Sequence, residues 1–322
     1  MTTMSLFERI KRAHSAIRPQ VLITPLERSR PLSAALGCEV LLKAEHLQPT
    51  GSFKVRGATN KIHVLGAEVR RTGVITASTG NHGQAVARAG ALAGVPVTVC
   101  VSASAARSKM EAIKGLGATL VVVEGTPLDA ELQARRRAAE EHLPYISPYN
   151  DLDVVAGQGT LGVELIEQAP QLDAVFICVG GGGLIGGTGT ALKQLRPQTR
   201  VVGVWPENSP CMLRALEAGR IIDVPESPTL SDGTAGAVEP GSVTFPICQS
   251  VIDQTVTVSE AEIAGAMRRI AAAERWIVEG SAGVALAGLI KLADAHKGKT
   301  VAVVLCGRNV ALETFLEAIG RA

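Results

Sequence analysis

The sequence predicts an α/β protein with two lobes, each built on a doubly wound parallel sheet. Short runs rich in β-branched residues alternate with Ala-rich helical stretches along almost the whole chain. Each run is continuously apolar, as in strands that are buried on both faces. The 322 residues also exceed the usual size of one hydrophobic core, so we expect two lobes that share a cleft.

The elements follow from this alternation in chain order. We expect strands at Glu39–Lys43, Val74–Thr76, Val95–Val101, Thr119–Val123, Ala174–Val179, Val201–Val204 and Thr300–Cys306. We expect helices at Gly80–Ala93, Ala103–Leu116, Pro127–Glu141, Gly157–Gln168, Leu184–Gln194, Glu260–Arg275 and Ala282–Asp294. Two irregular stretches remain. Pro144–Asp153 is the expected crossover between lobes, and Asp223–Pro246 is either a functional loop or a plain surface excursion.

Composition argues against several classes of function. The 32 Lys and Arg residues nearly balance the 30 Asp and Glu residues, so we expect no nucleic-acid or membrane partner and favour a small neutral or zwitterionic substrate. The six cysteines are scattered, which argues against a disulfide framework or a structural zinc site. No apolar signal core or membrane-length run is visible, so we expect a cytoplasmic protein.

Lys54 stands in the first motif, Gln48–Ala58 (QPTGSFKVRGA). It follows a Pro/Gly turn and Phe53, at the expected start of a helix. A lysine in this setting can be partly desolvated, which favours the neutral amine that imine formation requires. The alternative is an ordinary solvated lysine near a turn.

The second motif, Ala77–Gln84 (ASTGNHGQ), follows a strand and opens a helix. Backbone amides at a helix N-terminus, together with the hydroxyls of Ser78 and Thr79, form a socket for a carboxylate. Asn81 could donate a hydrogen bond to a phenolic oxygen. His82 is either a general base or a side chain that satisfies nearby backbone groups.

The third motif is the run Gly180-Gly181-Gly182-Gly183-Leu184, again between a strand and a helix. Without Cβ atoms, its backbone N–H groups can converge on a phosphate at the start of the helix. The same run fits a dinucleotide pattern through Gly181, Gly183 and Gly186, with Glu207 as the ribose acid. A tightly packed structural turn is the third interpretation.

Cys306 marks the fourth motif, Val304–Asn309 (VLCGRN), at the end of the last expected strand. This position lies at the carboxyl edge of the sheet, where open α/β folds bind ligands. The alternative role of Cys306 is that of a small buried apolar side chain.

Taken together, these segments resemble the fold-type II pyridoxal-phosphate (PLP) enzymes, specifically the threonine/serine dehydratase and serine racemase family. The resemblance runs from Thr24 to Asn309 and rests on Ser-Phe-Lys-x-Arg-Gly-Ala, Ser-x-Gly-Asn-His-Gly and the four-glycine run, in that order. It implies the tryptophan synthase β-like fold, with a large PLP-binding domain at residues 1–72 and 151–322 and a small mobile domain at 73–150. It also implies a homodimer.

The resemblance assigns a role to each motif. Lys54 is the Schiff-base lysine and general base, and Phe53 packs against the PLP ring. Asn81 bonds the phenolic oxygen, and Cys306 faces the pyridine nitrogen. The phosphate is bound by the amides of Gly180, Gly181, Gly182, Gly183 and Leu184. The substrate carboxylate is gripped by Ser78, Thr79, Gly80, Asn81 and His82.

Four positions bear further on the chemistry. Asp232 is aligned beside the substrate and could orient its hydroxyl group. Thr79 stands where the racemases have a catalytic serine. Trp205 replaces an acid of the metal-activated members, so we expect no metal site. Arg308 either binds an acidic or polar group on an unusual substrate or pairs with a surface carboxylate.

The expected reaction is β-elimination: L-threonine, L-serine or a related β-hydroxy amino acid is dehydrated and deaminated to a 2-oxo acid and ammonia. A thiol at Cys306 is a weak neutral donor, which disfavours a protonated pyridine nitrogen and therefore transamination. The alternatives are serine racemase or β-replacement synthase activity, and a dehydratase of hydroxyectoine breakdown. A nicotinamide-dependent oxidoreductase and a PLP-binding regulatory protein are the remaining hypotheses.

Overall fold

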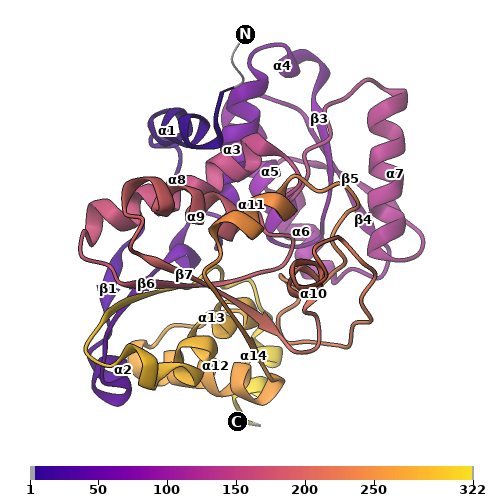
Figure 1. Cartoon of the computed structure of the whole chain (residues 1–322). Helices are drawn as coiled ribbons and strands as arrows, with labels where there is room; N and C mark the ends of the chain where they lie inside the picture. The colour runs from indigo at the N-terminus through magenta and orange to yellow at the C-terminus, as the bar shows by residue number, and fades with distance from the viewer. Residues whose placement is uncertain (1–3, 321–322) are drawn as a thin grey trace.

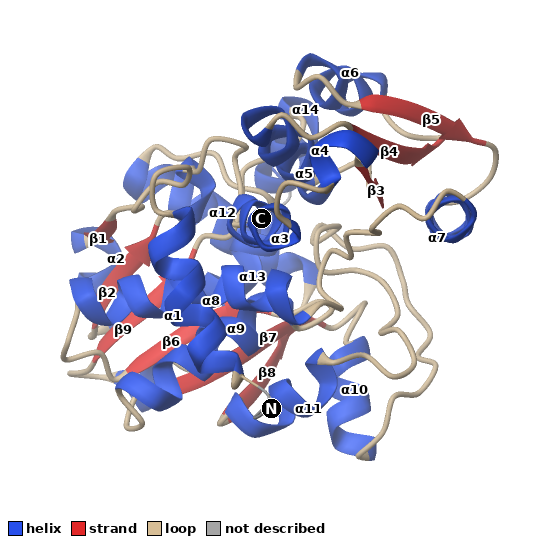
Figure 2. Cartoon of the chain, turned by 90° about the horizontal axis from the view of Figure 1, so that it is seen from above, coloured by secondary structure: helices blue, strands red, loops and turns tan. Residues whose placement is uncertain are grey.

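The structure, a computed structural model, describes residues 4–320 and contains two separate sheets (Figures 1 and 2). The larger sheet has the order β1 (Leu26–Arg28), β2 (Glu39–Lys43), β9 (Thr300–Val304), β6 (Ala174–Cys178), β7 (Arg200–Pro206) and β8 (Gln254–Val258). The smaller sheet has the order β3 (Val74–Ala77), β4 (Val97–Ser102) and β5 (Thr119–Val123). Every strand pair is parallel except β1 with β2.

Helices cover both faces of the larger sheet, as in a doubly wound fold (Figure 1). One face is covered by α1 (Leu6–Ile17), α8 (Leu152–Gln168) and α9 (Gly183–Leu195), and the other by α12 (Glu260–Glu274), α13 (Gly280–Lys291) and α14 (Leu312–Gly320). Packed around the smaller sheet are α5 (Asn81–Ala93), α6 (Arg107–Gly115) and α7 (Pro127–Glu140). The fold class predicted from the sequence is therefore confirmed.

The remaining helices are short or connect the two sheets. They are α2 (Arg30–Leu36), α3 (Lys54–Leu65), α4 (Val69–Thr72), α10 (Cys211–Ala218), α11 (Thr244–Val251) and two 3₁₀ turns (Glu45–Leu47 and Ala293–His296). The helix α3 packs against both α5 and α8, so it joins the layers of the two sheets. Because Lys54 is the first residue of α3, its backbone is fixed by both halves of the molecule.

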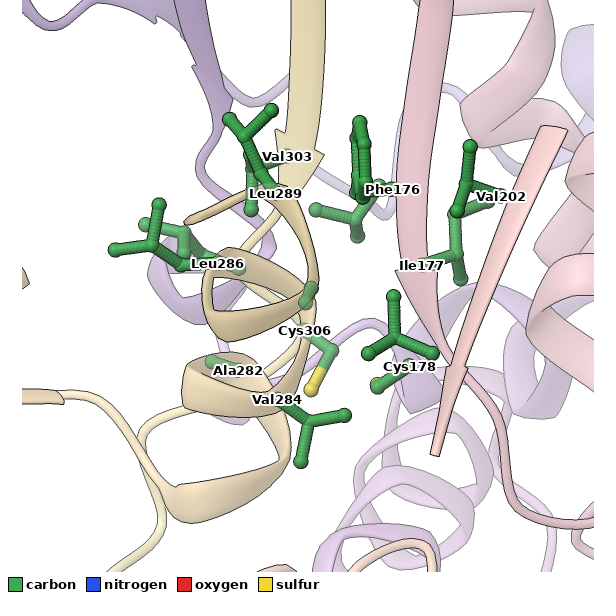
Figure 3. Close-up of a cluster of buried hydrophobic side chains, with 14 of the residues drawn as sticks. Phe176, Ile177, Cys178, Val202, Ala282, Val284, Leu286, Leu289, Val303 and Cys306 are labelled. Atoms are coloured by element: carbon green, nitrogen blue, oxygen red, sulfur yellow. The ribbon is translucent and has the colours of Figure 1, made fainter. Parts of the chain in front are cut away.

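The main core lies between the larger sheet and α13. Phe176, Val202, Val303 and Leu289 are fully buried there (Figure 3). Aliphatic side chains dominate this interior, as the composition predicts. Close packing of such side chains holds the strand ends rigidly, and these ends carry the candidate site.

The predicted strands are all present, with shifts of a few residues at their ends. The sequence did not predict β1 and β8, which are edge strands without long apolar runs. The expectation that Thr119–Val123 is buried on both faces is wrong, because Val122 is 56% exposed. This strand is β5, the edge of the three-stranded sheet, and therefore has a partner on one side alone.

The sheets bear on the proposed division into domains. All strands of the smaller sheet lie within residues 73–150, and all strands of the larger sheet lie in 1–72 and 151–322. We propose that these are the small and the large domain. Within residues 4–320, none of the helices combines the length and the apolar character needed to cross a bilayer.

Candidate active site

A cavity of about 1800 Å³ is lined by residues from both sheets. Ala77 and Ser102 come from the carboxyl ends of β3 and β4. Cys178 ends β6, and Cys306 follows β9. Ligands of parallel α/β folds bind at this edge of a sheet, where the strands end and loops diverge. The cavity is therefore the candidate active site.

All residues that the sequence assigned to the site line this one cavity. They are Phe53, Lys54, Ser78, Thr79, Gly80, Asn81, His82, Gly180, Gly181, Gly182, Gly183, Leu184, Asp232 and Cys306. Segments far apart in the chain thus meet at one place, while the role of each residue stays a prediction.

Lys54 has few polar partners for a lysine in this position. Its Nζ donates a hydrogen bond to the carbonyl oxygen of Pro148 at 2.9 Å and lies 5.2 Å from the centre of the Phe53 ring. Burial lowers the pKa of Lys54 to about 8. A large share of this amine is therefore neutral at mildly alkaline pH, as a nucleophile or a base must be.

The loop before Lys54 pairs with the segment that follows β9. Ser52 and Gly307 form an isolated antiparallel bridge, and Phe53 N–H donates to the Cys306 carbonyl oxygen at 3.0 Å. Gly51 has a φ of +74°, and a Cβ there would lie 2.7 Å from Asn309 Oδ1. The loop thus needs glycine at position 51, and the pairing brings Lys54 and Cys306 into one site.

The glycine turn before α9 has no room for side chains. A Cβ on Gly181 would lie 2.4 Å from the Tyr149 ring, and a Cβ on Gly180 would lie 2.8 Å from the Thr234 carbonyl oxygen. Gly182 has a φ of +85°, a conformation that favours glycine. The turn therefore exposes backbone rather than side chains, as a phosphate-binding turn does.

Four of the helices that start at the cavity have no side-chain cap. In α3, α5, α9 and α13, no side chain caps the first turn. Capping boxes are present elsewhere: Thr126 caps α7, whose first residues also line the cavity, and Ser259 caps α12. The first N–H groups of a helix have no acceptor within it, so uncapped starts leave donors free for an anionic ligand.

His82 is buried and neutral. Its Nε2 is 3.0 Å from the Ile146 carbonyl oxygen, and burial lowers its pKa to about 3. Nε2 must carry the proton to donate to this carbonyl, which leaves Nδ1 as an acceptor without a partner among residues 4–320. This geometry favours the interpretation that His82 satisfies the local backbone over a role as general base.

Asn81 contacts a carboxylate that the sequence analysis did not single out. Its Nδ2 lies 3.0 Å from both carboxylate oxygens of Glu279, and its Oδ1 accepts a hydrogen bond from the side-chain amide of Asn309. Glu279 is 3% exposed, and burial raises its pKa. The amide of Asn81 is therefore held on both sides within the site.

Cys306 is a buried thiol at the end of the core (Figure 3). Its Sγ donates towards Glu279 Oε1 at 3.7 Å, and Cys178 is its second hydrogen-bonding partner. The contact with Cys178 and burial raise the pKa of Cys306. The sulfur thus stays protonated and uncharged at neutral pH, whatever group it faces.

Asp232 and Arg308 have contrasting positions. Asp232 lines the cavity and forms an ion pair with Lys109 at 3.2 Å, which links the long irregular loop to α6. The Arg308 side chain is exposed and does not line the cavity. Arg308 N–H donates to the Gly51 carbonyl oxygen, so its backbone supports the Lys54 loop. The expectation that Arg308 answers a substrate group is not supported by this position.

Sequence reasoning missed three contributors to the site: Glu279, Pro148 and Tyr149. Glu279 is a single acid between Val278 and a run of small residues that begins a buried helix, which is a weak sign of a buried carboxylate. Pro148 contributes a backbone carbonyl, which leaves no trace in the sequence. Tyr149 packs on Gly181 and accepts a hydrogen bond from Glu239 N–H at 2.9 Å through its hydroxyl.

Potential metal ligands are dispersed in the part of the chain that the structure describes. No three or more His, Cys, Asp or Glu side chains gather there in a group that could hold a metal ion. Trp205 is fully buried.

Comparison with known proteins places these motifs in a family context. The sequence profile of the family described as pyridoxal-phosphate dependent enzyme matches residues 17–307. The chain is 41% identical over 308 residues to an L-threonine ammonia-lyase of Thermotoga maritima, covering 95% of this chain and 76% of the relative. It is 35% identical over 307 residues to a beta-hydroxyaspartate dehydratase of Paracoccus denitrificans, covering 95% and 97% of the two chains.

Similarity extends to solved structures. Threonine deaminase isoform 2 from Solanum lycopersicum superposes with a TM-score of 0.95 at 33% sequence identity. The superposition covers 98% of this chain and 93% of the tomato chain. The two-sheet arrangement therefore belongs to a known architecture.

Proposed function

The chain belongs to the family of pyridoxal-phosphate dependent enzymes, and on that premise we propose that it catalyses β-elimination from a small β-hydroxy amino acid. L-Threonine, L-serine or a related compound such as 3-hydroxyaspartate would be converted to a 2-oxo acid and ammonia. The observation that carries the proposal is that the Lys54 amine, the glycine turn and Cys306 line one cavity. The activities named for the relatives support the same reaction class.

The residues of the cavity fit the cofactor. Lys54 offers an amine with a lowered pKa to the aldehyde of PLP, and Gly180–Gly183 offers free amides to its phosphate. Asn81 and Cys306 offer polar atoms to the ring. When bound, PLP supplies an electron-withdrawing ring that acidifies the Cα–H of the amino acid joined to it.

Substrate binding falls to the start of α5. The backbone N–H groups of Ser78–His82 and the positive end of the helix would bind the α-carboxylate. The hydroxyls of Ser78 and Thr79 lie beside these amides in the cavity wall. Asp232 would orient the β-hydroxyl from the opposite loop once its ion pair with Lys109 is exchanged for the substrate.

Proton transfer falls to Lys54. Its Nζ, held by the Pro148 carbonyl in a partly buried position, takes the α-proton as the general base. The β-hydroxyl then leaves as water. Uptake of one water molecule and loss of ammonia complete the conversion to the 2-oxo acid, so the net change is deamination. The neutral thiol of Cys306 offers no negative charge to a ring nitrogen, which favours elimination over transamination.

The test is a panel of β-hydroxy amino acids scored for both 2-oxo acid and ammonia. We expect equimolar products from at least one of serine, threonine and 3-hydroxyaspartate, and no turnover by Lys54→Ala. Lys297→Ala, at an exposed lysine outside the cavity, is the matched control and should keep full activity. Products formed at the wild-type rate by Lys54→Ala would contradict the proposal.

We also propose that the protein is cytoplasmic and forms a homodimer. Support for both statements comes from the family resemblance. Sedimentation of the purified protein at several concentrations tests the dimer, and a monomer at all of them would contradict it.

A further inference from the structure

The carboxylate of Glu279 accepts hydrogen bonds from three donors in two distant segments. It accepts from Asn81 Nδ2 at the start of α5, from Asn309 N–H at 3.1 Å and from Cys306 Sγ at 3.7 Å. Asn309 also donates from its side chain to Asn81 and to the Thr50 carbonyl oxygen. Glu279 therefore links the start of α5 to the segment after β9, and Asn309 extends this link to the loop before Lys54.

All of these donors are uncharged. Among residues 4–320, no lysine or arginine forms an ion pair with Glu279, although its side chain is buried. A buried carboxylate without a cation is strongly disfavoured unless its surroundings are fixed. Its presence at the cavity wall therefore points to a role in the site rather than in general stability.

Two local features direct this side chain into the site. Glu279 is the N-cap residue of α13, yet its side chain makes no capping hydrogen bond with that helix. Gly307 lies against the carboxylate, and a Cβ there would be 2.6 Å from the carboxyl carbon and from both oxygens. The Glu279 side chain thus does not cap α13, and the lack of a Cβ at Gly307 leaves room for it to reach Asn81 and Cys306.

We propose that Glu279 is a positioning residue of the cofactor site, where its carboxylate fixes the orientation of the Asn81 amide and the Cys306 thiol as one unit. Because Glu279 accepts from Nδ2 and Asn309 donates to Oδ1, the Asn81 amide cannot flip without losing these hydrogen bonds, so it keeps one orientation at the cavity wall. The Cys306 proton is directed to Glu279, which fixes the rotation of this side chain at the cavity wall. This inference rests on PLP binding in the cavity, as proposed above.

The decisive experiment compares Glu279→Gln with the wild type in two measurements that do not need turnover. The first is the Kd for PLP of the apo-protein. The second is the induced circular dichroism of the bound PLP in the visible region, which reports how rigidly the ring is held. Gln keeps the shape but loses one acceptor, so we expect Kd to rise about tenfold and the induced signal per bound PLP to fall.

The matched control is Glu274→Gln. Glu274 is half-buried and, like Glu279, accepts a hydrogen bond from a neutral donor, in this case Ser29, but it lies at the end of α12 and does not line the cavity. This variant should bind PLP with wild-type Kd and wild-type induced signal. A Kd and induced signal equal to wild type in Glu279→Gln would overturn the inference while leaving the proposed reaction intact. Failure of the wild type to bind PLP would instead overturn both.

A double-mutant cycle separates positioning from a general structural role. In an Asn81→Ala background, Glu279 has lost the group that it orients, so Glu279→Gln should raise Kd much less than in the wild type. Equal effects in both backgrounds would overturn the proposed unit. If Glu279→Gln did not fold, Glu279→Asp decides: it keeps the charge but falls short of Asn81, so its Kd should also rise, and an unchanged Kd would refute the inference.

Discussion

Lys43 and Lys54 differ in how their side-chain amines are paired. Lys43 ends β2 and is fully buried, and its Nζ donates to Thr24 O at 2.9 Å, to Glu164 Oε2 at 2.7 Å and to Gln168 Oε1 at 2.9 Å. All three donors of this ammonium group are used. Lys54 donates to one backbone carbonyl and otherwise faces the cavity.

The same contrast holds for the carboxylates beside them. Glu164 forms ion pairs with both Lys43 and Arg56, whose guanidinium also binds Glu45, so the charges of this buried group cancel. Glu279 has neutral donors alone. Buried charges that form ion pairs, such as Glu164, stabilise the fold. A buried carboxylate without an ion-pair partner, such as Glu279, lies at the candidate active site.

Glu164→Gln is expected to have the largest effect on the free energy of unfolding. Removing this charge leaves Lys43 and half of the Arg56 guanidinium uncompensated inside the protein, so we expect a loss of about 3–5 kcal/mol in the free energy of unfolding. Urea denaturation measures this loss. The folded fraction should keep wild-type PLP affinity, because the network does not line the cavity.

The control is Glu167→Gln in the same helix. Glu167 pairs with Arg18 at 3.6 Å on the surface, with 46% of its side chain exposed, so its loss should change stability by less than about 0.5 kcal/mol. Comparable losses for the two variants would break the distinction between a balanced buried network and ordinary surface pairs.

Much of this architecture can be predicted from the sequence because it is encoded locally. Strand Glu39–Lys43 contains the apolar run Val40–Leu42, and the start of helix Pro127–Glu140 is marked by the N-cap residue Thr126 and a proline at the first position. The glycine run, Lys54 and Asn81 lie within short motifs whose chemistry is visible in a few residues. Edge strands β1 and β8 carry too little apolar pattern to be recognised.

The rest depends on contacts between distant segments. Glu279 meets Asn81 across 198 positions in the chain, and nothing near either residue encodes the pairing. The acceptor for Lys54 is a backbone carbonyl at Pro148, which any residue could supply. The same holds for Tyr149, whose ring fills the space that the glycine at position 181 leaves open. Burial and long-range register, rather than local pattern, create these features.

The next effect concerns the cavity itself. In Gly181→Ala, the new Cβ would lie 2.4 Å from the Tyr149 ring, so the turn must shift and its amides leave their positions. We expect the Kd for PLP to rise by roughly 10- to 100-fold, equivalent to about 1–3 kcal/mol, and the apo-protein to lose about 1–3 kcal/mol of stability through overpacking. Equilibrium dialysis measures Kd. Gly115→Ala, where an added Cβ meets nothing within 4 Å, should leave Kd unchanged, and a larger effect there than at Gly181 would contradict the assignment of the turn.

The smallest expected effect compares the two lysines: replacing Lys54 by Met should raise the stability of the apo-protein, whereas replacing Lys43 by Met should lower it. Burial lowers the pKa of Lys54 to about 8 in the folded chain, against 10.5 for an ordinary lysine. Below pH 8 both states carry the proton and the folded state bears the full desolvation penalty. Between pH 8 and 10.5 the unfolded chain binds more protons, so the free energy of unfolding rises with pH.

Lys54→Met should therefore stabilise the apo-protein by about 1–2 kcal/mol at pH 7, with the pH-dependent part of this gain fading towards pH 10.5. Lys43→Met should destabilise it, because Glu164 loses a partner. Thermal denaturation of both variants across this pH range decides the matter: a loss of stability in Lys54→Met would mean that the amine is as well paired as that of Lys43.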